Sequence, residues 1–280
     1  MDGTFISRSP KSEKLFGFIS HYYFHESKNS NDQNAFFYYP NTKNALTIYK
    51  NSKLEVVQGS HTRTTPSDPG YSFNYAQLFN SIGKAEIIGA FNRVGVVFEP
   101  MGLNHFVSED LSNVINKGIN INFNYFKDSL SGVLDLVYSE ENIEIKVELL
   151  DEYFISQFVG FKEKRLLQIR DMVIRSESKL TVNELSSQLD ISRKTLLRMF
   201  KRHLDCTPTE YLTLMQFRKA IEIYNASKGD TSLTNVALDS LYCDQSSFIH
   251  HFKKVTNFNP KEFFKNVAQF GNHPTFWILD

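Results

Sequence analysis

The C-terminal third of the chain contains an imperfect internal repeat whose two copies share one layout. The matched stretches are LTVNELS at 180–186 and TSLTNVA at 231–237, LLRMFKR at 196–202 and FIHHFKK at 248–254, and TPTEY at 207–211 and NPKEF at 259–263. In the last pair, Thr207 or Asn259 can cap a helix, proline suits its first turn, and the glutamate three residues after the cap can bond back to the cap N–H. Each copy therefore ends where a new helix begins.

Each copy also follows the pattern of a helix-turn-helix unit. A short helix with apolar residues three positions apart carries a small residue, Ser186 or Ala237, where a second helix approaches, and a short turn then leads into a longer helix. The pattern predicts such units at about 180–204 and about 232–257. The residues between them predict a linking helix at about 208–225, which would be roughly 25 Å long at about 1.5 Å per residue.

The longer helix of each unit has one apolar face, which leaves its basic and polar side chains pointing outward. Arg and Gln can make bidentate contacts with base edges in the major groove, and these outward side chains also suit phosphates. The predicted DNA-contacting residues are Arg193, Lys194, Leu197, Arg198 and Lys201 in the first unit, and Gln245, Ser246, Ser247, His250, Lys253 and Lys254 in the second. One basic helix face is more often plain solvated surface. Two in register, held roughly one DNA turn of about 34 Å apart, favour DNA binding.

The distribution of charge along the chain supports DNA binding by the second half. Residues 1–160 hold 13 Lys/Arg against 18 Asp/Glu, whereas residues 161–280 hold 18 against 13, so a formal charge of zero hides halves of −5 and +5. We therefore expect only residues 161–280 to meet a polyanion. A histidine at position 250, on the outward face, predicts that DNA binding by the second unit depends on pH.

The first half has the alternation of β-strands. Runs of β-branched and aromatic residues, such as 36–40, 46–49 and 93–98, are separated by Asn, Gly, Pro and Ser clusters, and helical spacing begins only near residue 128. The predicted fold class is α+β. A mainly antiparallel barrel or sandwich with a helical tail at 1–160 precedes an all-α domain of two helix-turn-helix units at 161–280. The many aromatic side chains are better explained by core packing than by an apolar pocket.

The C-terminal region resembles the DNA-binding domain of AraC/XylS-family transcription regulators. The resemblance rests on 192–201, on Thr207-Pro208, and above all on DQSSFIHHFKK at 244–254 with Pro260. It implies seven helices, with the third and sixth as recognition helices. By position it implies base-reading roles for Lys194, Leu197 and Arg198, and for Gln245, Ser246 and His250. The departures are Asp205, Leu241 and Asn257 where the family has glycine, and Gln216 and His250 where arginine is common.

The first half resembles, more weakly, the cupin-like barrel that precedes this domain in part of the family, through 15–24, 46–49 and 94–103. This second resemblance implies a sensory or assembly role for the first half. Together, the two resemblances imply a sequence-specific regulator of transcription, either an activator or a repressor, that is controlled by an effector or partner. Its partners would be duplex DNA, RNA polymerase, a small-molecule effector and a second copy of the chain. The alternative is a small-molecule-binding or metal-dependent barrel enzyme that carries a DNA-binding module.

We expect no enzyme activity, no catalytic residue, no cofactor and no metal. His21, His25, His61 and His105 lack the closely spaced His-x-His and following glutamate of cupin metal sites. The sequence has no apolar run of about 18 residues and no secretion signal, so we expect a cytoplasmic protein without a membrane partner. Cys206 and Cys243 are expected to be reduced packing residues.

Overall fold

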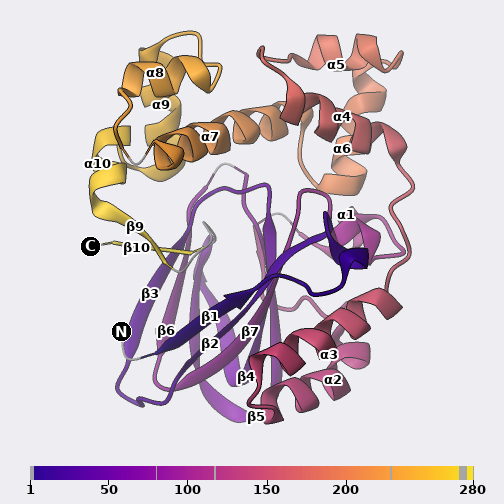
Figure 1. Cartoon of the computed structure of the whole chain (residues 1–280), viewed down its shortest axis with the longest axis vertical. Helices are drawn as coiled ribbons and strands as arrows, with labels where there is room; N and C mark the ends of the chain where they lie inside the picture. The colour runs from indigo at the N-terminus through magenta and orange to yellow at the C-terminus, as the bar shows by residue number, and fades with distance from the viewer. Residues whose placement is uncertain (1–2, 80, 117, 228, 271–275, 280) are drawn as a thin grey trace.

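The computed structural model describes residues 3–79, 81–116, 118–227, 229–270 and 276–279, and it divides them between a strongly curved sheet and a helical region (Figure 1). The strands of the first half are β1 (Thr4–Arg8), β2 (Ile19–Ser27), β3 (Gln33–Tyr38), β4 (Asn44–Gln58), β5 (His61–Gln77), β6 (Gly83–Ile88), β7 (Phe91–Phe98) and β8 (Gly118–Asn120). Their order in the sheet is β1-β2-β7-β4-β5-β6-β3, and β8 pairs with β5. All pairings are antiparallel except β5 with β6. The α+β fold class is confirmed.

Both faces of the sheet are packed. Alternate side chains of β2, β4 and β7, among them Tyr22, Leu46 and Val96, face helices α2 (Lys127–Ser139) and α3 (Ile143–Ser156). The opposite set, among them Tyr23 and Val97, fills the inside of the curve. The aromatic residues Phe36, Tyr38, Phe73 and Tyr75 all belong to these cores. Core packing is therefore the use that the structure gives to these four.

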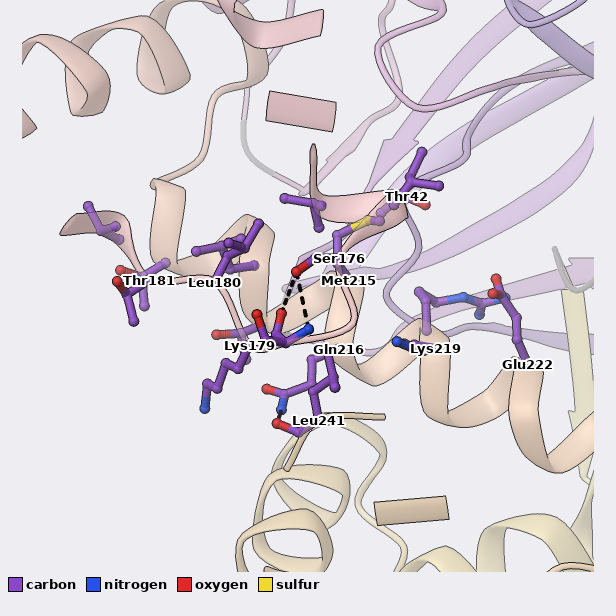
Figure 2. Close-up of a pocket in the computed structure, with 18 residues that line it drawn as sticks. Thr42, Ser176, Lys179, Leu180, Thr181, Met215, Gln216, Lys219, Glu222 and Leu241 are labelled. Carbon is purple, nitrogen blue, oxygen red and sulfur yellow. Dashed lines mark hydrogen bonds between the residues drawn. The ribbon is translucent and has the colours of Figure 1, made fainter. Parts of the chain in front are cut away.

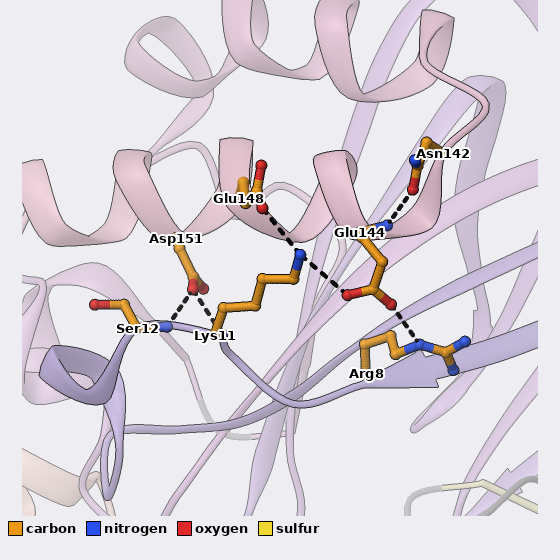
Figure 3. A network of polar contacts seen from close by, with 7 residues as sticks. All are labelled: Arg8, Lys11, Ser12, Asn142, Glu144, Glu148 and Asp151. Carbon is orange, nitrogen blue, oxygen red and sulfur yellow. Dashed lines mark hydrogen bonds and ion pairs between the residues drawn. The ribbon is translucent and has the colours of Figure 1, made fainter.

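A polar network fastens α3 to the segment that follows β1 (Figure 3). The Asp151 carboxylate is buried and accepts hydrogen bonds from the Lys11 N–H at 2.8 Å, the Ser12 N–H at 2.7 Å and the Tyr22 hydroxyl at 2.8 Å. Lys11 also pairs with Glu144 and Glu148 at the surface. Exposed pairs of this kind contribute little, so the buried carboxylate is the main fastening.

The second half is helical and repeats itself as predicted. Its elements are α4 (Lys164–Arg175), α5 (Val182–Gln188), α6 (Arg193–Leu204), α7 (Pro208–Ala226), α8 (Leu233–Asp239), α9 (Gln245–Thr256) and α10 (Pro260–Asn266). Capping boxes start α7 at Thr207 and α10 at Asn259, each followed by proline. Helices α6 and α9 end at Asp205 and Asn257, both in the left-handed region with φ of 50° and 63°. These short polar residues tolerate that conformation, so the missing glycines do not disrupt either helix end.

The C-terminal residues depart from the predicted division of the chain. Strands β9 (Val267–Phe270) and β10 (Phe276–Leu279) form a hairpin, and β10 pairs with β3 at Trp277 and Phe37. Residues 161–280 were all assigned to the helical half, but this hairpin extends the sheet of the first half. The physical reason is that β3 otherwise has an unpaired edge, which an apolar strand can satisfy with backbone hydrogen bonds.

Candidate nucleic-acid interface

Helix α6 presents an exposed cationic face. Its N-cap, Ser192, accepts a hydrogen bond from the Thr195 N–H at 3.1 Å, and Leu196, Met199 and Phe200 are buried in the core of the first unit. This packing turns the other faces of the helix outward. Of the contact residues predicted on this helix, Lys201 is half-buried. The other four are exposed: Arg193, Lys194, Leu197 and Arg198.

Helix α9 repeats this arrangement in the second unit. The Asp244 carboxylate caps it by accepting the Ser247 N–H at 2.6 Å, and Phe248, Phe252 and Val255 are buried. The hydrogen bonds from the Ser247 and Ser246 groups lower the pKa of Asp244. The predicted residues of this helix are all exposed: Gln245, Ser246, Ser247, His250, Lys253 and Lys254.

The two histidines of α9 lie in different environments. His250 is exposed, whereas His251 is half-buried and its Nδ1 lies 2.6 Å from the Tyr242 hydroxyl. Burial, together with the nearby charge of Lys254, lowers the pKa of His251 to about 4. His251 is therefore neutral near pH 7, and the side chain that faces outward is His250.

The cations on these faces have no carboxylate partner in the part of the chain that the structure describes. Among the described residues, no carboxylate lies within ion-pair distance of the arginine and lysine side chains predicted to contact DNA. Arg202, the next basic residue of α6, differs because its Nε lies 2.5 Å from the Asp110 carboxylate. Arg202 therefore links α6 to the first half of the chain, and the free cations are left for an external anion.

The C-terminal end of α6 is bonded to the first half. The last carbonyls of a helix have no partner within the helix. Here the Gln77 amide donates to the Leu204 carbonyl at 2.6 Å, and the Asn104 amide donates to the His203 carbonyl at 2.7 Å. Both amides are buried. The first half thus holds the C-terminal end of α6, through β5 and the turn after β7, and the predicted base-reading residues lie toward the other end.

Residues 185–266 match a family model described as a helix-turn-helix domain. This region is an AraC-type helix-turn-helix domain. Counted from α4, which precedes the matched residues, to α10, the described residues supply seven helices, with α6 third and α9 sixth. Where Leu241 replaces the usual glycine, the backbone keeps the left-handed conformation with φ of 66°. Gln216, in place of arginine, donates to the Leu241 carbonyl at 2.5 Å and so links α7 to the turn of the second unit.

Known proteins resemble the chain in part. The transcriptional regulatory protein HptR of Staphylococcus aureus is 25% identical over 123 residues, which are 44% of this chain and 43% of the relative. The HTH-type transcriptional regulator CdhR of Pseudomonas aeruginosa is 23% identical over 140 residues, which are 45% of this chain and 41% of the relative. The chain thus spans less than half the length of these curated relatives. A solved structure of ToxT from Vibrio cholerae aligns with 86% of this chain and 98% of its own, at 14% identity and a TM-score of 0.47.

The histidines considered for a metal site do not come together. His25 accepts from Arg93, His61 lies beside Glu86, and the ring of His105 accepts the Phe161 N–H. Within the described part of the chain, no group of three or more His, Cys, Asp or Glu side chains is placed to hold a metal ion.

Over the described residues, no helix is both long and apolar enough to cross a membrane. Cys206 is buried as predicted, but Cys243 is exposed, so the packing role predicted for Cys243 is wrong.

Sequence reasoning missed two features of the AraC-type domain. One is the pair of amides that hold α6, because Gln77 and Asn104 lie about a hundred residues or more from their acceptors. The other is Arg218, a buried cation on α7. A signal for it was present, since positions 214, 217, 218 and 221 share one helix face and the other three are apolar.

Proposed function

We propose that this chain is a sequence-specific DNA-binding transcription regulator whose AraC-type domain reads two adjacent segments of the major groove. The observation that carries the proposal is the pair of exposed, unneutralised cationic faces on α6 and α9. They are joined by α7, whose 19 residues span about 28 Å at about 1.5 Å per residue. That length, with side-chain offsets, suits two adjacent groove segments of about 34 Å separation.

The predicted contact residues divide into two roles within this proposal. Lys194, Leu197 and Arg198 on α6, and Gln245, Ser246 and His250 on α9, would meet base edges near the start of each helix. The remaining predicted residues, Arg193, Lys201, Ser247, Lys253 and Lys254, would meet phosphates and orient the domain. The first half would control the domain through an effector or partner. RNA polymerase and a second copy of the chain are further proposed partners.

Selection of genomic fragments by the full chain, followed by anisotropy titration of the enriched duplex, tests the proposal. The full chain is used because β10 (Phe276–Leu279) pairs with β3 of the first half. We expect binding that weakens with salt at a logarithmic slope of about −0.9 per phosphate contact. Lys253→Ala should reduce that slope by about one contact, whereas Lys127→Ala, an exposed lysine on α2, should not change it. Salt-independent binding, or no enrichment of any duplex, would overturn the proposal.

A further inference from the structure

Arg202 lies on the same outward face of α6 as two of the predicted base-reading residues. Lys194, Arg198 and Arg202 follow one another at four-residue intervals, so they lie one above another along the helix. All three residues are exposed, and the side chain of Arg202 is 61% exposed. Arg202 therefore shares the face that is proposed to meet DNA, although it is not among the predicted contact residues.

The distance along the helix relates Arg202 to the phosphates rather than to the bases. A recognition helix meets base edges with its N-terminal residues. Arg202 comes eight residues after Lys194, which is about 12 Å along the axis at about 1.5 Å per residue. The major groove is itself about 12 Å wide, so a side chain this far from the base-reading end suits the backbone that borders the groove. A guanidinium matches a phosphate there with two parallel hydrogen bonds.

A carboxylate of the first half holds this guanidinium in the structure. The Asp110 carboxylate lies 2.5 Å from Nε of Arg202. Its other neighbour is His203, whose Nδ1 lies 3.8 Å away. Burial lowers the pKa of His203 more than Asp110 raises it, so this ring is neutral near pH 7. Among the described residues, Arg202 is therefore the charged partner of Asp110.

The carboxylate of Asp110 is available to Arg202 because it does not cap its own helix. Asp110 occupies the N-cap position of α1 (Leu111–Val114), where an aspartate ordinarily accepts a backbone N–H of the first turn. Among the described residues its side chain makes no such bond, and it reaches α6 of the other half instead. An anion of the first half thus lies on the recognition helix at a position that suits a DNA phosphate.

We propose that Arg202 is a further DNA-contact residue, and that Asp110 masks it by occupying the position of a backbone phosphate. This inference rests on the proposed function, and it gives the first half a direct electrostatic effect on DNA affinity. While the pair is closed, the two side chains carry no net charge, and the carboxylate repels a phosphate that approaches Arg202. Withdrawal of Asp110 adds one phosphate contact at the end of α6.

Anisotropy titrations of the full chain on the enriched duplex, over a series of salt concentrations, test the mask. Asp110→Asn keeps the shape of the side chain and removes its charge, and loss of a surface ion pair should leave the fold intact. This variant should bind about two- to five-fold more tightly, with a logarithmic salt slope steeper by about 0.9 for the added phosphate contact. The matched control is Glu109→Gln, which removes the same charge from the neighbouring exposed residue and should change both quantities less.

Arg202→Ala separates a masked contact from general repulsion between the protein and DNA. In the Arg202→Ala background, Asp110→Asn should tighten binding no more than Glu109→Gln does, because no cation is left to unmask. An equal gain from Asp110→Asn with and without Arg202, or a gain as large from Glu109→Gln, would overturn the mask. Unchanged or weaker binding by Asp110→Asn would overturn it too. Failure of the native chain to bind any duplex would overturn the proposed function, and the mask with it.

Discussion

Truncation of Arg198 is the sharpest test of the predicted base contacts. The side chain is exposed and has no ion-pair partner among the described residues, so Arg198→Ala should change the free energy of unfolding by less than about 0.5 kcal/mol. A bidentate contact with a base is worth about 1 to 3 kcal/mol. Because about 1.4 kcal/mol of binding free energy corresponds to a ten-fold change in Kd, losing this contact should raise the Kd for the enriched duplex about 5- to 150-fold.

The assay is fluorescence anisotropy with the full chain, at fixed salt, on the enriched duplex and on a scrambled duplex of equal length. Arg198→Ala should weaken binding to the enriched duplex far more than to the scrambled one, which removes sequence preference at one position. Lys253→Ala, a phosphate contact in this reasoning, should weaken both alike. If Arg198→Ala weakened both duplexes equally, Arg198 would be a phosphate contact and its assigned base-reading role would be refuted.

Three further predictions address the pH response and the caps. Native DNA binding should be tighter at pH 6 than at pH 8 at fixed ionic strength, because a protonated imidazole at position 250 can donate to an acceptor on a base edge and is also attracted by nearby phosphates. His250→Gln should abolish the difference, and an equal pH response in both proteins would exclude His250. His251 does not interfere because its pKa lies at about 4. Burial lowers the pKa of His105 to about 4, so the folded state disfavours the proton that the unfolded state accepts. His105 should therefore contribute about 2 kcal/mol to the loss of stability between pH 7.5 and pH 5, as urea unfolding would measure, and His105→Gln should make that loss smaller by about this amount, leaving the contribution of the half-buried His251 in place. Thr207→Ala removes the capping box of α7 and should destabilise the chain by about 1 kcal/mol in the same assay, whereas the exposed Thr209→Ala should have little effect.

Local signals predicted the helical half well because each rests on residues close together in sequence. The linking helix was predicted at 208–225 and lies at Pro208–Ala226, since a capping box and proline fix its start. The family resemblance placed Asp205 and Asn257 where glycine is usual, and both short polar residues keep the left-handed backbone that ends each helix. The burial of one face of α6 and α9 followed from apolar spacing.

The features that sequence did not predict depend on contacts between distant segments. The hairpin that ends in β10 pairs with β3, and neither strand carries a signal that identifies the other. A cavity of about 500 Å³ lined by the end of α4 and by α7 (Figure 2) depends on how these two helices pack, which single-sequence periodicity does not specify. Arg218, a cation on an apolar helix face, is visible in the sequence, but only packing shows that its Nε and Nη1 atoms have no hydrogen-bond partner among the described residues.

The relative position of α6 and α9 is held by more than the helix that joins them. The first unit is fastened to the first half by two amides on the end of α6, that of Gln77 in β5 and that of Asn104 in the turn after β7. The second unit is fastened to the first half by β10, which pairs with β3 (Figure 1). It is also fastened by Tyr39, directly after β3, whose ring centroid lies 4.8 Å from that of Phe263. A change in the angle between the two units must therefore strain or release one of these contacts. The sheet of the first half thus sets, together with α7, the spacing at which the two exposed helices meet their target.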